Sequence, residues 1–290
     1  MRKINNLQKR IDIARERYFK IIKGKESLLK IISEAELSEH VYNSNAIENS
    51  TLTLEETEKI LLEIDLNRYI PSRELFEAKN LATVMEYIEN NATQKEMSLD
   101  MMLFLHKVLI SNIRDDIAGR WRKGDEFVRV GSHITPAPKE IVSRLTDTLN
   151  EYKANTKDGI VRRIAKLHLD FEYTHPFIDG NGRIGRVINN YILIREGYVP
   201  INIKFTDRQK YYDAFKAYDK KKDTEIMEEI IGLSLLQSYY KRLAYMENKK
   251  IVTLAEYSKK HKISLSNLIN KAHRGTVEAF IDRGVWKIGV

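Results

Sequence analysis

The chain has 290 residues, of which 42% are hydrophobic and 31% are charged. This composition fits an ordered protein with one large domain, or one domain plus a small appendage. It contains no cysteine, so disulfide bonds and thiolate–metal sites are excluded. Residues 1–20 are charged throughout, and no run approaches the length of a membrane span. We therefore expect no signal peptide, no membrane contact and a cytoplasmic location.

Helices are predicted over most of the chain before residue 119. Apolar residues recur at helical spacing, and Thr53 with Glu56 forms a capping-box pattern in front of one apolar run. The expected helices cover about residues 4–22, 28–48, 53–66, 72–88 and 98–109.

The pattern changes over residues 119–138. Residues 127–130 are rich in β-formers, Gly131 and Ser132 give a turn signal, and residues 133–135 follow as a second strand. A short hairpin in a helical protein is more often a flap over a site than part of the core, although a plain connector is the alternative.

Helices resume near Pro138 and continue to about residue 248, with one glycine-rich loop between two strongly apolar helices. Such helices make a rigid mounting for a site. After the helix that begins near Pro138, further helices are expected at about residues 160–171, 184–196, 206–218 and 224–248.

The glycine-rich loop, residues 175–186, reads His-Pro-Phe-Ile-Asp-Gly-Asn-Gly-Arg-Ile-Gly-Arg. Gly180 and Gly182 allow a tight turn that leaves backbone N–H groups free, and the following helix presents its positive end at the same place. The stretch therefore predicts a cradle for an anion. A glycine turn that only caps a helix is the plainer alternative.

Four side chains of this loop have the chemistry for moving a phosphoryl or nucleotidyl group. Arg183 and Arg186 lie on one helix face, so both can bind phosphate oxygens in forked geometry. Asp179 supplies one hard oxygen ligand, which suits a Mg²⁺ ion held mainly by nucleotide phosphates and water. His175 is the only group of the loop that exchanges a proton near neutral pH, so it is the candidate base.

The loop matches every fixed position of the signature of the Fic family, His-x-Phe-x-Asp/Glu-Gly-Asn-Gly-Arg-x-x-Arg, and the chain resembles that family. The resemblance implies an all-α fold, with a Fic-type helical core and a β-hairpin flap. It also implies transfer of AMP from ATP to a Ser, Thr or Tyr hydroxyl of a protein, the chain itself included.

The family's roles carry over residue by residue. His175 would take the proton of the target hydroxyl, and Asp179 would hold Mg²⁺. The nucleotide phosphates would be bound by Gly180, Asn181, Gly182, Arg183 and Arg186.

Two neighbouring segments extend the resemblance. Residues 119–138 look like the family's flap, whose backbone is thought to align the target by strand addition. The flap residues concerned are Phe127, Val128, Arg129 and Val130. Tyr211 and Tyr212 resemble the segment on the adenine side of the nucleotide, although ordinary core packing explains tyrosines there equally well.

Residues 44–49, Ser-Asn-Ala-Ile-Glu-Asn, resemble the family's inhibitory motif, Ser/Thr-x-x-x-Glu-Gly/Asn. The resemblance implies that Glu48 pairs with Arg186 and occupies the group that should bind the γ-phosphate. ATP would then be misoriented, and a misplacement of about 1 Å can cost ~100-fold in rate. Without the signature loop, Glu48 reads as a surface glutamate at a helix end.

The net charge of +8 is concentrated at residues 249–290, which hold nine Lys and Arg against three Asp and Glu. The other 248 residues hold 40 against 38. A basic segment indicates nucleic acid or another acidic partner, although a segment that only aids solubility has the same composition.

The basic segment predicts two helices joined by a turn and then a two-stranded hairpin, which is similar to the winged helix-turn-helix of excisionase-type DNA-binding domains. There the second helix would enter the major groove and the wing would touch the backbone. Docking or dimer packing is the alternative. The candidate DNA contacts are Ser264, Ser266, Asn267, Asn270, Lys271 and Arg274, with Lys287 on the wing.

We expect a helical extension at residues 1–35, a Fic domain at 36–248 that includes an inhibitory helix at 36–50, and a winged-helix-like domain at 249–290. The expected partners are ATP with Mg²⁺, a protein target and double-stranded DNA, and a homodimer is left open. Two alternatives remain. One is a DNA-binding regulator whose core senses nucleotide or modifies itself. The other is an enzyme that removes AMP with the help of Glu48, or transfers another nucleotide.

Overall fold

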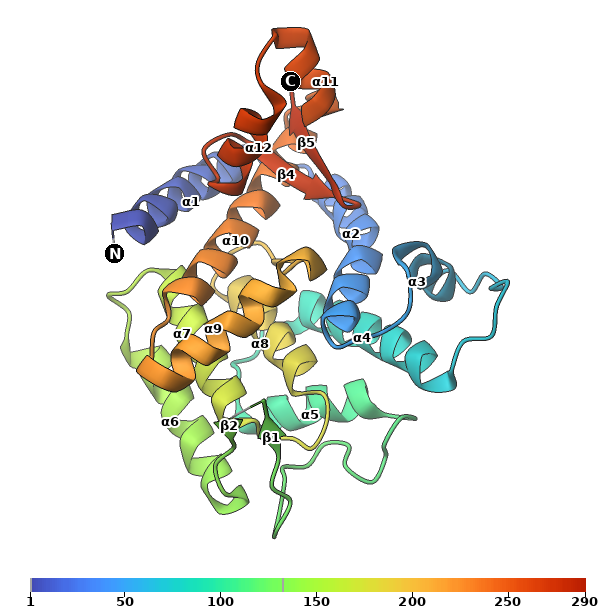
Figure 1. Cartoon of the computed structure of the whole chain (residues 1–290), viewed down its shortest axis with the longest axis vertical. Coiled ribbons are helices and arrows are strands. Elements are labelled where there is room, and N and C mark those ends of the chain that lie inside the picture. Colours follow the sequence, from blue (N-terminus) through green and yellow to red (C-terminus); the bar gives the residue numbers. More distant parts are fainter. Residues whose placement is uncertain (1, 132) are drawn as a thin grey trace.

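The computed structural model describes residues 2–131 and 133–290, and this part is mainly helical, as predicted (Figure 1). Ser132, from the expected turn, lies outside the described residues. The helices are α1 (Arg2–Ile21), α2 (Glu26–Ile47), α3 (Leu54–Leu61), α4 (Ser72–Asn91), α5 (Leu99–Ile110), α6 (Ile141–Ala154), α7 (Ile160–Thr174), α8 (Asn181–Arg195), α9 (Arg208–Lys221), α10 (Glu225–Met246), α11 (Leu254–His261) and α12 (Leu265–His273). The 3-10 turns are η1 (Pro138–Glu140) and η2 (Phe205–Asp207).

Local sequence signals set the helix boundaries. The capping box before α3 is formed as expected, because Thr53 and Glu56 each accept the other's backbone N–H. However, α3 ends at Leu61, five residues before the expected end. Glu63 adopts a left-handed φ of 57°, which a continuing helix does not allow.

Helix α8 lies in the core of the helical body, packed against α4, α5 and α7. Ile184, Ile188 and Tyr191 on this helix are fully buried. Each such side chain contributes about 1.5–3 kcal/mol through burial. Because α8 is enclosed by other helices, its first turns are held in place, and these contain the second half of the signature, residues 181–186.

The hairpin consists of β1 (Arg129–Val130) and β2 (His133–Ile134), which pair antiparallel with Arg129 opposite Ile134. Both strands are shorter than predicted. The hairpin is tied to the helical body through His133, whose Nδ1 lies 3.1 Å from Asp219 Oδ1 and whose Nε2 lies 2.9 Å from the carbonyl oxygen of Tyr173.

The C-terminal domain is built from α11, α12 and the strands β3 (Ile251–Thr253), β4 (Ala279–Asp282) and β5 (Val285–Gly289), in the order β3-β5-β4. Strand β3 is an addition to the predicted hairpin. The domain has its own small core, and it sits on α10 and beside α1 (Figure 1). The residues of that core are Leu254, Leu268, Ala272, Ala279 and Ile288.

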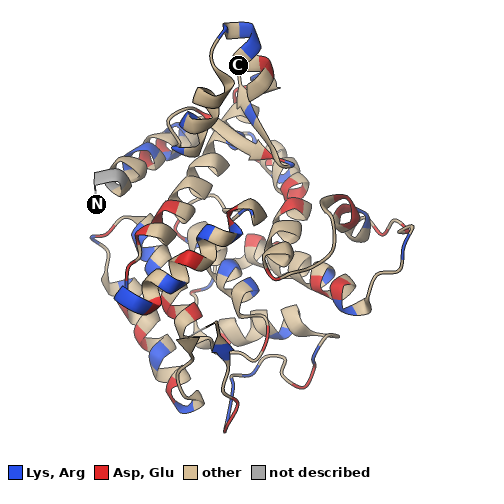
Figure 2. Ribbon diagram, viewed as in Figure 1, with Lys and Arg blue, Asp and Glu red and all other residues tan. Residues whose placement is uncertain are grey.

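The expected boundary at 248/249 lies just after the end of α10, whereas that at 35/36 falls inside the continuous helix α2. Figure 2 shows basic and acidic residues interspersed over the helical body, in line with its nearly neutral charge. Among the described residues, no helix combines the length and the apolar character needed to cross a membrane.

Candidate nucleotide site

The signature loop joins α7 to α8. His175 directly follows α7 with a left-handed φ of 47°, which few non-glycine residues adopt, and Gly180 caps α8 with a φ of 82°. The side chain of Asn181 accepts from the backbone N–H of Phe177 and donates to its carbonyl, both at 2.8 Å. Asn181 therefore closes the loop with its side chain. The first backbone N–H groups of a helix have no partner within it, so those at the start of α8 are the groups available to an anion.

His106 of α5 anchors the loop through hydrogen bonds and ring stacking, a role that sequence reasoning missed. Its Nε2 donates to the carbonyl of Asp179 at 3.0 Å, and its Nδ1 accepts from the backbone N–H of Gly119 at 3.1 Å. Its ring stacks on Phe177 at a centroid distance of 3.7 Å. Burial lowers the pKa of His106 to about 4, so the ring is neutral with its proton on Nε2.

Arg122 ties the loop to the hairpin, and sequence reasoning gave it no such role. Its side chain is buried and donates to the carbonyls of Thr174 and His175, at 3.2 and 2.8 Å. It also donates to the carbonyls of Glu126 and Pro136, on either side of the hairpin, at 2.8 and 3.1 Å. The unusual backbone at His175 is therefore fixed by its surroundings.

The imidazole of His175 has a carboxylate beside it. Its Nδ1 lies 3.7 Å from Oε2 of Glu172, one turn earlier in α7. Burial would raise the pKa of Glu172, but His175 and the neighbouring charges outweigh burial and hold it below its usual range. Gly185 leaves room for this carboxylate, since a Cβ there would come within 2.5 Å of Glu172 Oε1. A carboxylate at Nδ1 favours the proton on that nitrogen, which leaves Nε2 as the acceptor.

Asp179 and Arg183 lie in a cluster of opposite charges. The carboxylate of Asp179 accepts from Arg73 at 2.6 Å and from Arg183 at 3.3 Å, while Arg183 also pairs with Glu77 at 3.0 Å. Burial would raise the pKa of Asp179, but Arg183 and Arg73 outweigh burial and lower it. Arg73 and Glu77, both on α4, were not identified from the sequence, because nothing local links α4 to a loop about 100 residues later.

The donor set around Asp179 fits a magnesium ion bound together with a nucleotide. Among the described residues, no group of three or more His, Asp or Glu side chains is placed to hold a metal. One carboxylate suits Mg²⁺, which keeps several waters and takes other ligands from phosphates. An incoming ion would compete with Arg73 for the carboxylate.

Arg186 is bound from the end of α2. It donates to Ser44 Oγ at 2.9 Å, to the carbonyl of Ser44 at 2.8 Å and to Glu48 Oε1 at 2.9 Å. It also donates to the hydroxyl of Tyr211 at 3.3 Å. Burial would lower the pKa of Arg186, but Tyr211 and Glu48 outweigh burial and raise it. The guanidinium that the sequence assigns to a phosphate is thus occupied by Glu48.

The end of α2 is shaped to present Glu48. Asn49 has a left-handed φ of 72°, which asparagine tolerates better than most residues and which ends the helix. Tyr212 donates its hydroxyl to the carbonyl of Ile47 at 3.0 Å, and Arg208 donates to Asn49 Oδ1 at 2.5 Å. The end of α2 is therefore held by the same α9 segment in which the two candidate tyrosines lie.

A cavity of about 680 Å³ opens beside these groups. Its walls come from the loop, α2, α7, α9 and the hairpin, and the candidate residues that line it are Glu48, Val128, Arg129, Val130, His175, Gly182, Tyr211 and Tyr212. The structure therefore brings the candidate base, the loop glycine, the tyrosines and the hairpin around one space. Phe127 is exposed and is not among its walls.

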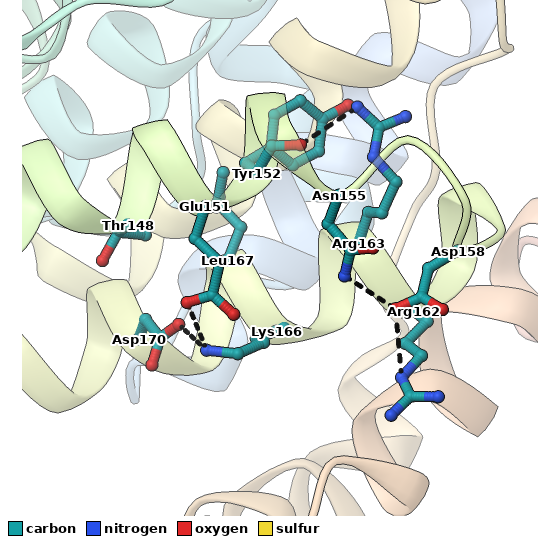
Figure 3. A pocket seen from close by; sticks show the side chains of 10 residues that line it. All are labelled: Thr148, Glu151, Tyr152, Asn155, Asp158, Arg162, Arg163, Lys166, Leu167 and Asp170. Carbon is teal, nitrogen blue, oxygen red and sulfur yellow. Dashed lines mark hydrogen bonds and ion pairs between the residues drawn. The ribbon is translucent and has the colours of Figure 1, made fainter.

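A second hollow, between α6 and α7, is too small for a nucleotide. It has a volume of about 20 Å³, and its charged side chains pair with one another, as Lys166 does with Glu151 and Asp170 (Figure 3). The space is on the scale of a single water molecule.

Comparison with known proteins agrees with this geometry. The model of the Fic/DOC family matches residues 96–193, which include α5, the hairpin, α7 and most of α8. The matched region contains the complete signature loop and the cavity wall formed by the hairpin. These residues form a Fic domain.

The similarity extends beyond the Fic domain. The chain is 32% identical over 212 residues to the "Protein adenylyltransferase Fic" of Nematostella vectensis, covering 70% of this chain and 48% of that protein. It is 31% identical over 232 residues to the protein of the same name from Drosophila willistoni, covering 73% and 45%. The chain therefore spans less than half the length of these relatives.

Solved structures share the fold. A Fic domain containing signaling protein from Bacteroides thetaiotaomicron superposes with a TM-score of 0.74 at 21% identity, over 83% of this chain and 98% of that one. A Fic family protein from Desulfovibrio desulfuricans gives 0.71 at 22% identity, over 93% and 87%. These likenesses confirm the Fic-type helical fold.

Proposed function

We propose that the protein transfers AMP from ATP to a Ser, Thr or Tyr hydroxyl of a protein, and that Glu48 restrains this activity. The observation that carries the proposal is the ion pair of 2.9 Å between Glu48 and Arg186 beside the cavity that His175 lines. The names of the relatives that match over 70% or more of this chain support the same reaction.

In the proposed step, the hydroxyl oxygen of the target attacks the α-phosphorus of ATP. The bond between the α-phosphorus and the oxygen that bridges it to the β-phosphate breaks, and pyrophosphate leaves. Nε2 of His175 takes the hydroxyl proton, and the Glu172 carboxylate, 3.7 Å from Nδ1, stabilises the imidazolium that forms. Backbone N–H groups at the start of α8 and the side chain of Arg183 stabilise the phosphate charges. Bound Mg²⁺, held by Asp179, would supply charge neutralisation between phosphates.

The hairpin would present the target. Arg129 and Val130 are exposed in a strand of two residues, and a target segment could extend this small sheet through backbone hydrogen bonds. Arg122 couples the hairpin to His175, so the hydroxyl would be delivered next to the base. This supports a protein hydroxyl as the acceptor.

The test is incorporation of label from ATP carrying ³²P at the α-phosphate, followed by mass spectrometry of the products formed in a cell lysate. Glu48→Gly frees Arg186, so we expect incorporation to rise on the order of 100-fold, the cost of a misplaced reacting group. His175→Ala in the Glu48→Gly background should abolish incorporation.

Glu63→Gly is a matched control, since Glu63 also follows a helix end but is exposed, and among the described ion pairs its one partner is Lys79. Incorporation by this variant should equal that of the wild type. Equal incorporation by Glu48→Gly and wild type would overturn the restraint, and label that survives His175→Ala would overturn the role of the base.

A further inference from the structure

The C-terminal domain presents a pair of helices that takes no part in the proposed transfer reaction. Helices α11 and α12 are joined by residues 262–264, and Lys262 ends α11 with a left-handed φ of 54°. Ser264 then caps α12 by accepting the backbone N–H of Asn267. The two helices pack against each other through a short turn, the arrangement of a helix-turn-helix.

The acidic and the basic side chains of this domain differ in whether they have a partner. Its acidic side chains are engaged, since Asp282 pairs with Lys241 and Lys287, Glu278 pairs with Arg17 and Lys249, and Glu256 completes a capping box. The cations of the helix pair are exposed and have no carboxylate partner among the described ion pairs. They are Lys259, Lys260, Lys262, Lys271 and Arg274.

The outer face of α12 carries groups that read base edges. Leu268 and Ala272 face the small core, which turns Ser266, Asn270 and Arg274 away from it, and all three are exposed. Asparagine amides and hydroxyls bind base edges, and arginine binds guanine or phosphate. A helix with side chains, about 10–12 Å across, fits a major groove about 12 Å wide.

The hairpin β4–β5 is turned towards the helical body. Arg283 at its tip pairs with Glu58 of α3, and Lys287 donates to Asp282 at 2.6 Å. Both cations are already paired with a carboxylate. Lys287 therefore drops out of the set of DNA contacts that this geometry favours, and phosphate contacts fall to the helix pair.

We propose that α11 and α12 form a docking surface for double-stranded DNA, with α12 in the major groove and the lysines of α11 on the phosphates. An acidic protein is the less favoured partner, because protein interfaces are depleted in lysine and centre on aromatic anchors. The outer face of α12 carries serine, asparagine and arginine instead.

The test uses the full chain without ATP, so its result does not depend on transferase activity. A fluorescein-labelled 20-base-pair duplex of random sequence is titrated, and anisotropy gives the affinity at several salt concentrations. For about four phosphate contacts, we expect affinity to fall on the order of 100-fold between 50 and 200 mM salt. Replacing Lys271 and Arg274 by glutamine should weaken binding and flatten the log–log salt slope by about 2 units.

The matched control replaces Lys95 and Lys139, two exposed lysines of the helical body, by glutamine, with the same loss of charge. Circular dichroism checks that all variants are folded. The proposal is overturned if the wild type does not bind the duplex at 50 mM salt, or if the control weakens binding as much as the double variant in α12. Equal affinity for a single strand of the same length would also overturn docking in a groove.

Discussion

At the scale of single residues, the site depends on one guanidinium with two prospective partners. Arg186 is buried and makes four hydrogen bonds, three of them to the end of α2. A γ-phosphate would have to replace the carboxylate of Glu48 and would bring more negative charge. The proposed restraint is therefore a competition for the side chain of Arg186 rather than a steric block of the site.

Glu172 gives a residue-scale prediction. We expect Glu172→Gln, made in the Glu48→Gly background, to lower kcat about tenfold, which is part of the ~100-fold or more that a positioned base contributes. The KM for ATP should change less than kcat, because Glu172 lies beside His175 and no described hydrogen bond joins it to Arg183 or Arg186. Kinetics with ATP labelled at the α-phosphate measure both quantities.

A readout that a purely structural role would not move is the ¹⁵N spectrum of His175. The fraction of the ring with its proton on Nδ1 should fall in Glu172→Gln, because the negative charge beside that nitrogen is lost. An unchanged tautomer ratio together with unchanged kcat would show that Glu172 does not orient the imidazole.

At the scale of elements, the last turn of α2 fixes the position of Glu48. Two hydrogen bonds from α9 fix that turn, one from Arg208 to Asn49 Oδ1 and one from Tyr212 to the carbonyl of Ile47, and the left-handed backbone of Asn49 ends the helix. The rest of the helix is anchored by buried charges, since Glu36 pairs with Arg242 of α10 at 2.6 Å. Glu48 is thus carried by an element with little freedom to shift.

Asn49 gives an element-scale prediction. Asn49→Val should lower the free energy of unfolding by about 1–2 kcal/mol, because a β-branched residue is strained at a φ of 72°. Asn49→Gly should cost less, since glycine accepts this φ and loses only the contact with Arg208. Urea unfolding measures both, and equal losses for the two variants would argue against backbone strain as the cause.

At the scale of the whole molecule, buried neutral histidines link the site to stability. His106 and His168 are fully buried, and burial lowers the pKa of each to about 4. In the unfolded chain both would titrate near 6.5. Between pH 6.5 and 4 the unfolded state therefore binds more protons, so the free energy of unfolding falls as pH falls through that window.

We expect a loss of about 2 kcal/mol per histidine at pH 5 relative to pH 7.5. Urea unfolding at the two pH values measures the loss. The mutant His168→Gln should retain more of its own stability on acidification, because one of the titrating groups is gone. A pH-independent free energy of unfolding would contradict the assignment.

Much of the fold could be predicted from the sequence because its signals are local. The helices follow from apolar spacing and caps, and the signature loop carries its chemistry within twelve residues. The resemblance also led to the pairing of Glu48 with Arg186, across 138 positions. His106, Arg122 and Arg73 could not be found in this way, because their roles arise only from contacts between distant elements.

Gly182 lies where Glu48 reaches Arg186 and also where the anion would bind, so it matters to both arrangements of the site. A Cβ there would overlap the carboxylate of Glu48 and lie 3.2 Å from Arg186 Nη1. The same missing methyl group leaves space at the start of α8, where the anion would bind. A mutation of this glycine would therefore disturb both the contact of Glu48 with Arg186 and the proposed anion site. A substitution at Glu48 would remove the proposed restraint alone, whereas one at Gly182 would also impair the proposed reaction.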